Sequence, residues 1–267
     1  MEKLKTSLIQ TTLQWEDIEA NLANFSQKIS SINEETDLIL LPEMFSTGFS
    51  MHPENIAEKP EGPTLKWMQD QAQKKNAAIS GSWIIQESGN YYNRLYFVFP
   101  DGEYKTYDKR HLFRFSGEQN KYSAGRNKLI VEYKGWKICP LICYDLRFPV
   151  WARNVEQYDL LFYGANWPAS RVLAWDTLLA ARSIENLCYT IGINRIGKDP
   201  NDNEYNGHSA AYNALGEKIS TSKWEQDFVQ TIELSKSHIR ETRKQFQFLN
   251  DRDNFMINYY RDFLSDQ

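Results

Sequence analysis

Three residues of types used in acyl transfer follow candidate strands of the sequence: Cys143 and Glu43 after apolar runs, and Lys109 after the second arm of a candidate hairpin. Cys143 comes directly after WKICPLI, a run typical of a buried strand, and polar residues and Pro149 follow it. In open α/β sheets the reacting groups lie at the carboxyl ends of strands, where side chains and backbone amides can face a ligand. Cysteine is more often a buried core residue, but at such a strand end it is a candidate nucleophile.

Two carboxylates and a lysine could support such a nucleophile. Glu43 follows the apolar run DLILL, and a carboxylate there could accept a proton from a thiol, which is mostly protonated at neutral pH. Lys109 and Glu118 stand in YDKRHLFRFSGEQNKY, a segment with more aromatic residues than a plain surface loop. Taken singly, Glu43 is equally well explained as a solvated loop residue, and Lys109 and Glu118 are better explained as solvated side chains.

The composition is that of an ordinary globular protein. The chain has 267 residues, 41% hydrophobic and 25% charged, which suits one large α/β domain or two small ones, and no linker or repeat divides it. A net charge of −4 gives no overall attraction for nucleic acid or an anionic membrane. The three cysteines are too few for a disulfide framework, and we find neither a signal peptide nor an apolar run of about 18 residues. We therefore expect one domain over 1–267, a cytoplasmic location, and neither nucleic-acid nor membrane partners.

Hydrophobic periodicity predicts the elements that must position these residues. Trp15, Ile18, Leu22, Phe25, Ile29 and Ile32 recur at helical spacing, Pro63 opens a second helix, and 170–187 reads as a crossover helix. Strands are expected at 4–9, 37–41, 77–86, 91–100, 103–107, 129–133, 136–142, 158–163 and 188–194. Two further strand-like stretches, 207–219 and 228–232, are expected to be joined by a turn at Leu215-Gly216. Alternating helices and strands with added hairpins predict two mixed sheets stacked face to face, with helices outside.

Three segments together resemble the signature blocks of the nitrilase superfamily of carbon–nitrogen hydrolases: LLPEMFSTGF, YDKRHLF before a Gly-Glu pair, and LICYDLRFP. They occur in the family's order, and NWP, ARSIEN and GHSAAYNALGE also look like family segments. The resemblance implies an α/β fold, the four-layer α-β-β-α sandwich with two mixed sheets, commonly paired as a homodimer. It also implies Glu43 as the catalytic base, Lys109 as the catalytic lysine, Cys143 as the nucleophile and Glu118 as an additional active-site glutamate.

The implied reaction hydrolyses an amide through a thioester on Cys143 and needs no metal or organic cofactor. Glu43 would take the thiol proton, while Lys109 and the backbone N–H of Tyr144 would stabilise the oxyanion. Preorganised donors of this kind are worth about 3 kcal/mol each. Whether Glu118 activates water or holds Lys109 stays open from the sequence.

Within the superfamily the sequence is most similar to the ω-amidases, which hydrolyse the terminal amide of 2-oxo acids such as 2-oxoglutaramate and 2-oxosuccinamate. The similarity lies in STGFS, LFRFSGE, CYDLRFP, NWPASR, ARSIEN and RKQFQFLNDRD, where Gln247 replaces the usual proline. A substrate carboxylate needs a cationic partner, preferably arginine. The candidates for the substrate site are Arg147, Arg171 and Arg114, with Phe115, Tyr144 and Trp167 as walls. An ion pair of Arg147 with Asp145 is the structural alternative.

The sequence leaves other functions open. The same residues would serve a nitrilase or a hydrolase of carbamoyl groups or other linear amides. A redox or binding protein that uses Cys139 and Cys143 is a further alternative, but four residues along a strand place the two thiols too far apart for a disulfide. The segment 235–267 is polar with six aromatic residues, and we expect this C-terminal tail to pack at a subunit interface.

Overall fold

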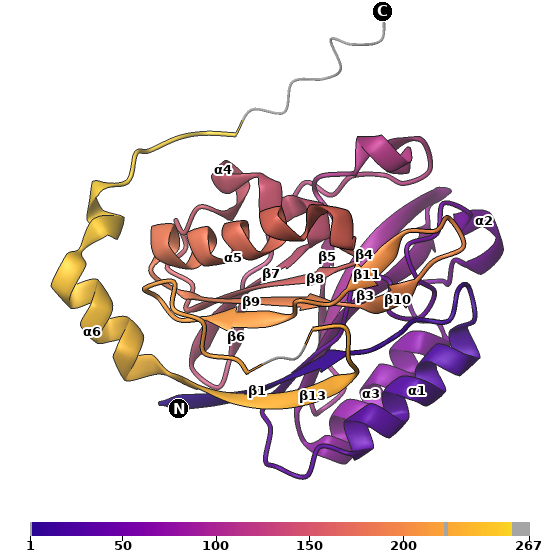
Figure 1. Ribbon diagram of the computed structural model, residues 1–267, viewed down its shortest axis with the longest axis horizontal. Helices are drawn as coiled ribbons and strands as arrows, with labels where there is room; N and C mark the ends of the chain where they lie inside the picture. The colour runs from indigo at the N-terminus through magenta and orange to yellow at the C-terminus, as the bar shows by residue number, and fades with distance from the viewer. Residues whose placement is uncertain (1, 222–223, 258–267) are drawn as a thin grey trace, which may run out of the picture.

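Two β-sheets lie face to face between layers of helices in this computed structural model, which describes residues 2–221 and 224–257 (Figure 1). The six-stranded sheet has the order β13 (Phe228–Ser235), β1 (Lys3–Gln10), β2 (Leu38–Leu40), β3 (Ala78–Glu87), β4 (Asn90–Val98) and β5 (Tyr104–Asp108). The five-stranded sheet has the order β12 (Ala210–Tyr212), β9 (Tyr189–Asn194), β8 (Leu160–Ala165), β7 (Trp136–Ile142) and β6 (Val131–Tyr133). Both sheets are mixed, because the parallel strands at their centres are flanked by antiparallel ones.

The alternation of side chains along β2 explains the layers. Leu38 and Leu40 belong to the apolar core between the two sheets, whereas Ile39 and Leu41 belong to the core beneath the helices. Successive side chains of a strand point to opposite faces, so a strand covered on both faces is apolar throughout. This is the physical reason for the uninterrupted run DLILL.

The helices cover the outer faces of the sheets (Figure 1). On the six-stranded sheet, α1 (Ile18–Ser30) begins after the N-cap Asp17, and α3 (Pro63–Lys75) begins at a proline. On the five-stranded sheet, α5 (Val172–Asn186) packs against β9 and β12, beside the short α4 (Pro149–Ala152). The remaining helices are α2 (Pro53–Ile56) and α6 (Lys236–Phe246). No helix within the described part of the chain has both the length and the apolar character to cross a membrane.

The predicted sandwich is confirmed, but the predicted connection between the last two strand-like stretches was wrong, and the helix α6 and one hairpin were not predicted. The turn at Leu215-Gly216 lies inside the first of the two stretches that it was expected to join, and the strands of these stretches, β12 and β13, belong to different sheets. The start of the tail forms the helix α6, because Ile239 and Thr242 are buried on one face of that segment. The small hairpin of β10 (Ile196–Lys198) and β11 (Glu204–Asn206) was missed. Cys188 lies one residue before β9 and is a buried free thiol.

The backbones of the two sheets meet beside the end of β2. A Cβ atom at Gly164 of β8 would lie 3.1 Å from the carbonyl oxygen of Leu41 and 3.2 Å from the backbone nitrogen of Glu43. Only a residue without a side chain fits there unless the backbone moves. Glu43 follows β2 of the six-stranded sheet, and this contact places it against β8 of the other sheet. The neighbour of β8 is β7, which ends directly before Cys143.

Candidate active site

The nucleophile candidate lies at a strained turn. Cys143 directly follows β7 and begins the 3₁₀ helix η3 (Cys143–Arg147), with a backbone φ of +42°. A left-handed conformation costs a non-glycine residue of the order of 1–3 kcal/mol and persists only where the surroundings impose it. The side chain is 9% exposed, and its sulfur lies 4.0 Å from the backbone oxygen of Asn166. The turn thus presents a thiol at the carboxyl end of a central strand.

Lys109 lies between two carboxylates from distant parts of the chain. Its Nζ donates to Oε1 of Glu43 at 2.8 Å and to both carboxylate oxygens of Glu118, at 3.0 and 2.9 Å. All three side chains are completely buried. The Phe49 ring centre lies 5.0 Å from the same Nζ. Because an unpaired charge is costly inside a protein, this arrangement fixes the ammonium group in one place.

Further hydrogen bonds orient the two carboxylates. Oε1 of Glu43 accepts from Nδ2 of Asn93 at 2.8 Å, and its Oε2 accepts from the backbone N–H of Asn166 at 2.9 Å. The Asn166 side chain also donates to the backbone oxygen of Glu43 at 2.6 Å. Oε2 of Glu118 accepts from the backbone N–H of Phe113 at 2.6 Å. Glu43 is thereby held as a hydrogen-bond acceptor beside the thiol.

Burial and neighbouring charges shift the pKa values of Cys143, Lys109 and Glu118. Burial and the Glu43 carboxylate raise the pKa of the Cys143 thiol well above its ordinary value, and Lys109 offsets only part of this rise. Burial alone would lower the pKa of Lys109, but Glu118 and Glu43 reverse the effect and raise it. Burial also raises the pKa of Glu118, against the opposing effect of Lys109. The resting site therefore holds a neutral thiol beside a buried ammonium group.

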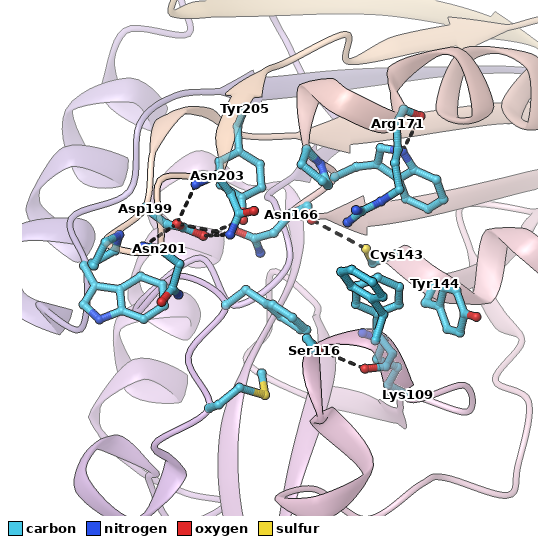
Figure 2. Close-up of a pocket in the computed structure, with 18 of the residues that line it drawn as sticks. Lys109, Ser116, Cys143, Tyr144, Asn166, Arg171, Asp199, Asn201, Asn203 and Tyr205 are labelled. Atoms are coloured by element: carbon cyan, nitrogen blue, oxygen red, sulfur yellow. Dashed lines mark hydrogen bonds between the residues drawn. The ribbon is translucent and has the colours of Figure 1, made fainter.

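A cavity of about 470 Å³ opens above Cys143 and Lys109. Figure 2 shows Arg171, Tyr144 and Cys143 on one side of it and Asp199, Asn201 and Asn203 on the other. The remaining lining includes Trp15, Phe49, Met51, His52, Phe113, Phe115, Ser116, Arg147, Asn166, Trp167, Pro168, Pro200 and Tyr205. Cavities of this size, with aromatic walls and a few polar groups, are typical of small-molecule sites.

The structure brings together most of the predicted site residues, but not all. Glu43, Lys109, Glu118 and Cys143 are adjacent, and Tyr144, Arg147, Arg171, Phe115 and Trp167 line the cavity. Arg114 is exposed and is not among the lining residues, since the 3₁₀ turn at Arg114–Ser116 brings Phe115 and Ser116 to the cavity instead.

The suggested ion pair of Arg147 with Asp145 was wrong. Asp145 bonds to His111 and Tyr107, whereas the guanidinium of Arg147 lies 5.1 Å from the ring centre of Trp167. No group of three His, Cys, Asp or Glu side chains in 2–221 and 224–257 is placed to hold a metal ion.

Several residues of the site were missed by the sequence reasoning. Asn93 lies inside β4 and has no local motif that would mark it. Asn166 follows strand β8 in GANWP, so its position at a strand end was a usable signal. The loop between β10 and β11 forms one wall, and Asp199 shapes it by accepting from the backbone N–H groups of Asn201 and Asn203 at 2.8 and 3.1 Å.

Comparisons with known proteins cover nearly the whole chain. A model of the carbon-nitrogen hydrolase family matches residues 5–244. The omega-amidase YafV of Yersinia enterocolitica is 44% identical over 96% of this chain and 100% of that protein. The 2-oxoglutaramate amidase of Bacillus subtilis is 31% identical over 90% of this chain and 95% of that protein. The crystal structure of XC1258 from Xanthomonas campestris, a CN-hydrolase superfamily protein with an arsenic adduct in its active site, aligns with a TM-score of 0.94 and 42% identity, over 97% of this chain and 100% of that chain.

Proposed function

We propose that this chain, which belongs to the carbon–nitrogen hydrolase family and hydrolyses amides, acts on monoamides of 2-oxo dicarboxylic acids. The products would be the 2-oxo dicarboxylic acid and ammonia. The observation that carries the proposal is the buried Glu43–Lys109–Glu118 cluster beside Cys143, in a cavity that also contains two arginines. The names of the similar omega-amidase and 2-oxoglutaramate amidase support this substrate class, with 2-oxoglutaramate and 2-oxosuccinamate as the first candidates.

The first step would form a covalent bond between the enzyme and the acyl group. Because the thiol is neutral at rest, the Cys143 sulfur attacks the amide carbon as Glu43 takes its proton. A C–S bond forms, and the π electrons of the carbonyl move onto oxygen. Lys109 Nζ and the backbone N–H of Tyr144 are the proposed donors to this oxyanion. The C–N bond then breaks as the nitrogen takes the proton from Glu43, and ammonia leaves a thioester on Cys143.

Water would complete the cycle. A glutamate takes a proton from water, the oxygen attacks the thioester carbon, and the tetrahedral intermediate expels the sulfur, which regains a proton as the acid leaves. Both oxygens of Glu118 bond to Lys109, and one of them also accepts from Phe113. We therefore assign Glu118 to holding Lys109 in place, and the base in this step to Glu43.

Arg147 and Arg171 are the proposed partners of the substrate carboxylate. Both line the cavity, and neither forms an ion pair among the described residues. The guanidinium of Arg171 lies 5.1 Å from the ring centre of Phe113 and 5.9 Å from that of Phe115, and Arg147 stacks on Trp167. An arginine stacked on an aromatic ring keeps its N–H groups free at the edge, where a carboxylate can bind with two hydrogen bonds.

The test is ammonia release from 2-oxoglutaramate and 2-oxosuccinamate, compared with simple nitriles and with amides that lack a carboxylate. We expect release from the oxo-acid amides by the wild type and none from Cys143→Ala. Arg147→Ala and Arg171→Ala should raise KM for these substrates, and Arg114→Ala is the matched control that should not. Preference for nitriles or for uncharged amides would refute the substrate class, and activity in Cys143→Ala would refute the mechanism.

The assembly and the location are also part of the proposal. Exposed apolar side chains on α4 and α5, namely Val150, Leu173 and Ile184, are a candidate homodimer contact. The tail residues Phe246, Phe248 and Phe255 are partly exposed and could extend it, whereas Tyr259, Tyr260 and Phe263 lie outside the described residues. Light scattering should give the mass of a dimer, and removal of 248–267 should weaken it; a monomeric wild type would exclude it.

A cytoplasmic location agrees with the free thiols Cys139, Cys143 and Cys188. Cell fractionation tests this part of the proposal. Recovery of the protein outside the cytoplasm would refute it.

A further inference from the structure

The carboxylate of Asp145 lies below the nucleophile turn and takes no part in the steps above. It is completely buried, and both of its oxygens accept hydrogen bonds. Oδ2 accepts from the backbone N–H of Ile142 at 3.1 Å and from the Tyr107 hydroxyl at 2.7 Å. Oδ1 accepts from the backbone N–H of His111 at 3.0 Å and lies 2.8 Å from the ring Nδ1 of His111. Since a carboxylate only accepts, Nδ1 carries a proton, and the four bonds hold the carboxylate in one orientation.

The partners of Asp145 come from both sheets. Ile142 is the last residue of β7 in the five-stranded sheet and immediately precedes Cys143. Tyr107 and His111 stand two residues before and two residues after Lys109, at and beyond the end of β5 in the six-stranded sheet. One carboxylate thus ties the backbone on both sides of the lysine to the residue before the nucleophile.

We propose that Asp145 is a positioning residue that sets the two oxyanion donors, Lys109 Nζ and the Tyr144 backbone N–H, at the correct separation. The inference rests on the proposed function, in which these groups stabilise the tetrahedral intermediate. The bond to the Ile142 N–H stabilises the turn in which Cys143 has its left-handed backbone. Donors of this kind act only when they are held in place before the charge develops.

Aromatic packing extends the same network to Tyr144. The His111 ring stacks on Phe148, with ring centres 3.7 Å apart and planes at 4°. Phe148 in turn packs edge to face against Tyr144, with centres 5.1 Å apart. The Asp145–His111 pair therefore supports the Tyr144 side of the oxyanion site as well as the lysine side.

The test is Asp145→Asn, which keeps the shape of the side chain. Its NH₂ group would face groups that donate hydrogen bonds to Asp145, such as the Ile142 N–H or the His111 N–H, and could not accept from them. The loss of these bonds should displace the two oxyanion donors, Lys109 Nζ and the Tyr144 N–H, by a fraction of an ångström. This displacement should lower kcat by about 100-fold, with KM changed by less than about twofold. Alkylation of Cys143 by iodoacetamide forms no oxyanion, so its rate should stay within about threefold of the wild type. Tyr107→Phe removes one of the four bonds and keeps the ring, and it should lower kcat by about tenfold in the same pattern.

Asp159→Asn is the matched control. Asp159 is also a buried carboxylate, and its Oδ2 accepts from the backbone N–H of Lys137 at 2.9 Å, near the opposite end of β7. This variant should lower the melting temperature and leave kcat within about twofold of the wild type, because it does not touch the site.

Two outcomes would overturn the inference. One is that both Asp145→Asn and Tyr107→Phe keep the wild-type kcat, and the other is that alkylation slows as much as kcat does, which would mean general disruption. A failure of the proposed function is distinguishable from both, because it would appear without any change at Asp145. The wild type would then prefer nitriles or uncharged amides, or Cys143→Ala would still hydrolyse the amide.

Discussion

Replacing Lys109 by methionine should destabilise the protein in a way that depends on pH. The lysine Nζ lies 2.8 Å from Glu43 and 2.9 Å from Glu118, and all three side chains have no exposed surface. Removing one partner of a buried ion pair costs about 3–5 kcal/mol, because the remaining charge is left uncompensated. Two carboxylates lose their partner here, so we expect a loss near 5 kcal/mol at about pH 8.

The loss should shrink in acid. Burial and Glu43 already raise the pKa of Glu118, and Lys109 opposes the rise. Without Lys109 the pKa of Glu118 in the folded state rises further above the unfolded value of 4.5. At pH values between the pKa of Glu118 in the unfolded chain and its pKa in the folded variant, the folded state binds more protons than the unfolded state. The unfolding free energy therefore falls as pH rises through this window, by up to about 1.4 kcal/mol per pH unit for one group.

Urea unfolding of the wild type and of Lys109→Met between about pH 5 and pH 8 measures this dependence. The double variant Lys109→Met/Glu118→Gln is the internal control, because it restores the net charge of the cluster. It should recover at least about half of the stability lost at pH 8. A deficit below about 1 kcal/mol at pH 8, or an equal deficit at every pH, would refute the reasoning.

Three further predictions concern the neighbours of this cluster. The rate of alkylation of Cys143 should keep rising with pH beyond the usual range of thiol pKa values. Glu43→Gln should move this rate–pH profile to lower pH, because the Glu43 charge helps to raise the pKa of the thiol. A profile that does not change in Glu43→Gln would contradict this. Asn93→Ala removes a 2.8 Å hydrogen bond to Glu43 and should lower kcat by about tenfold with little change in KM, measured by ammonia release. Gly164→Ala should cost about 1–3 kcal/mol in urea unfolding and should also lower kcat, since the new methyl group meets the backbone at Leu41 and Glu43; an active, fully stable variant would show that the sheets can separate.

The sequence alone was sufficient for the sandwich and for naming the residues that form the buried cluster beside Cys143. Burial on both faces makes β2 apolar throughout, and the periodicity of α1 marks one buried face, so these signals are local and can be read along the chain. Glu43 and Cys143 each follow such a strand, and Lys109 directly follows the second arm of a hairpin. A strand end is a local feature, so it marked these positions as candidates. The resemblance of three segments to one family then singled them out from the alternatives of core or solvated residues.

Only the tertiary structure decided which groups hold these residues in place. Glu43 bonds to Asn93, Lys109 and Asn166, which are 50, 66 and 123 residues away in sequence. Asp145 bonds to His111 across 34 residues and leaves Arg147, two positions away, without an ion pair among the described residues. Hydrophobic periodicity indicates that a strand is buried. The hydrogen-bond partners of the residues at the strand ends depend instead on how the two sheets stack. That stacking depends on contacts between side chains from strands far apart in the chain, and no local pattern encodes it.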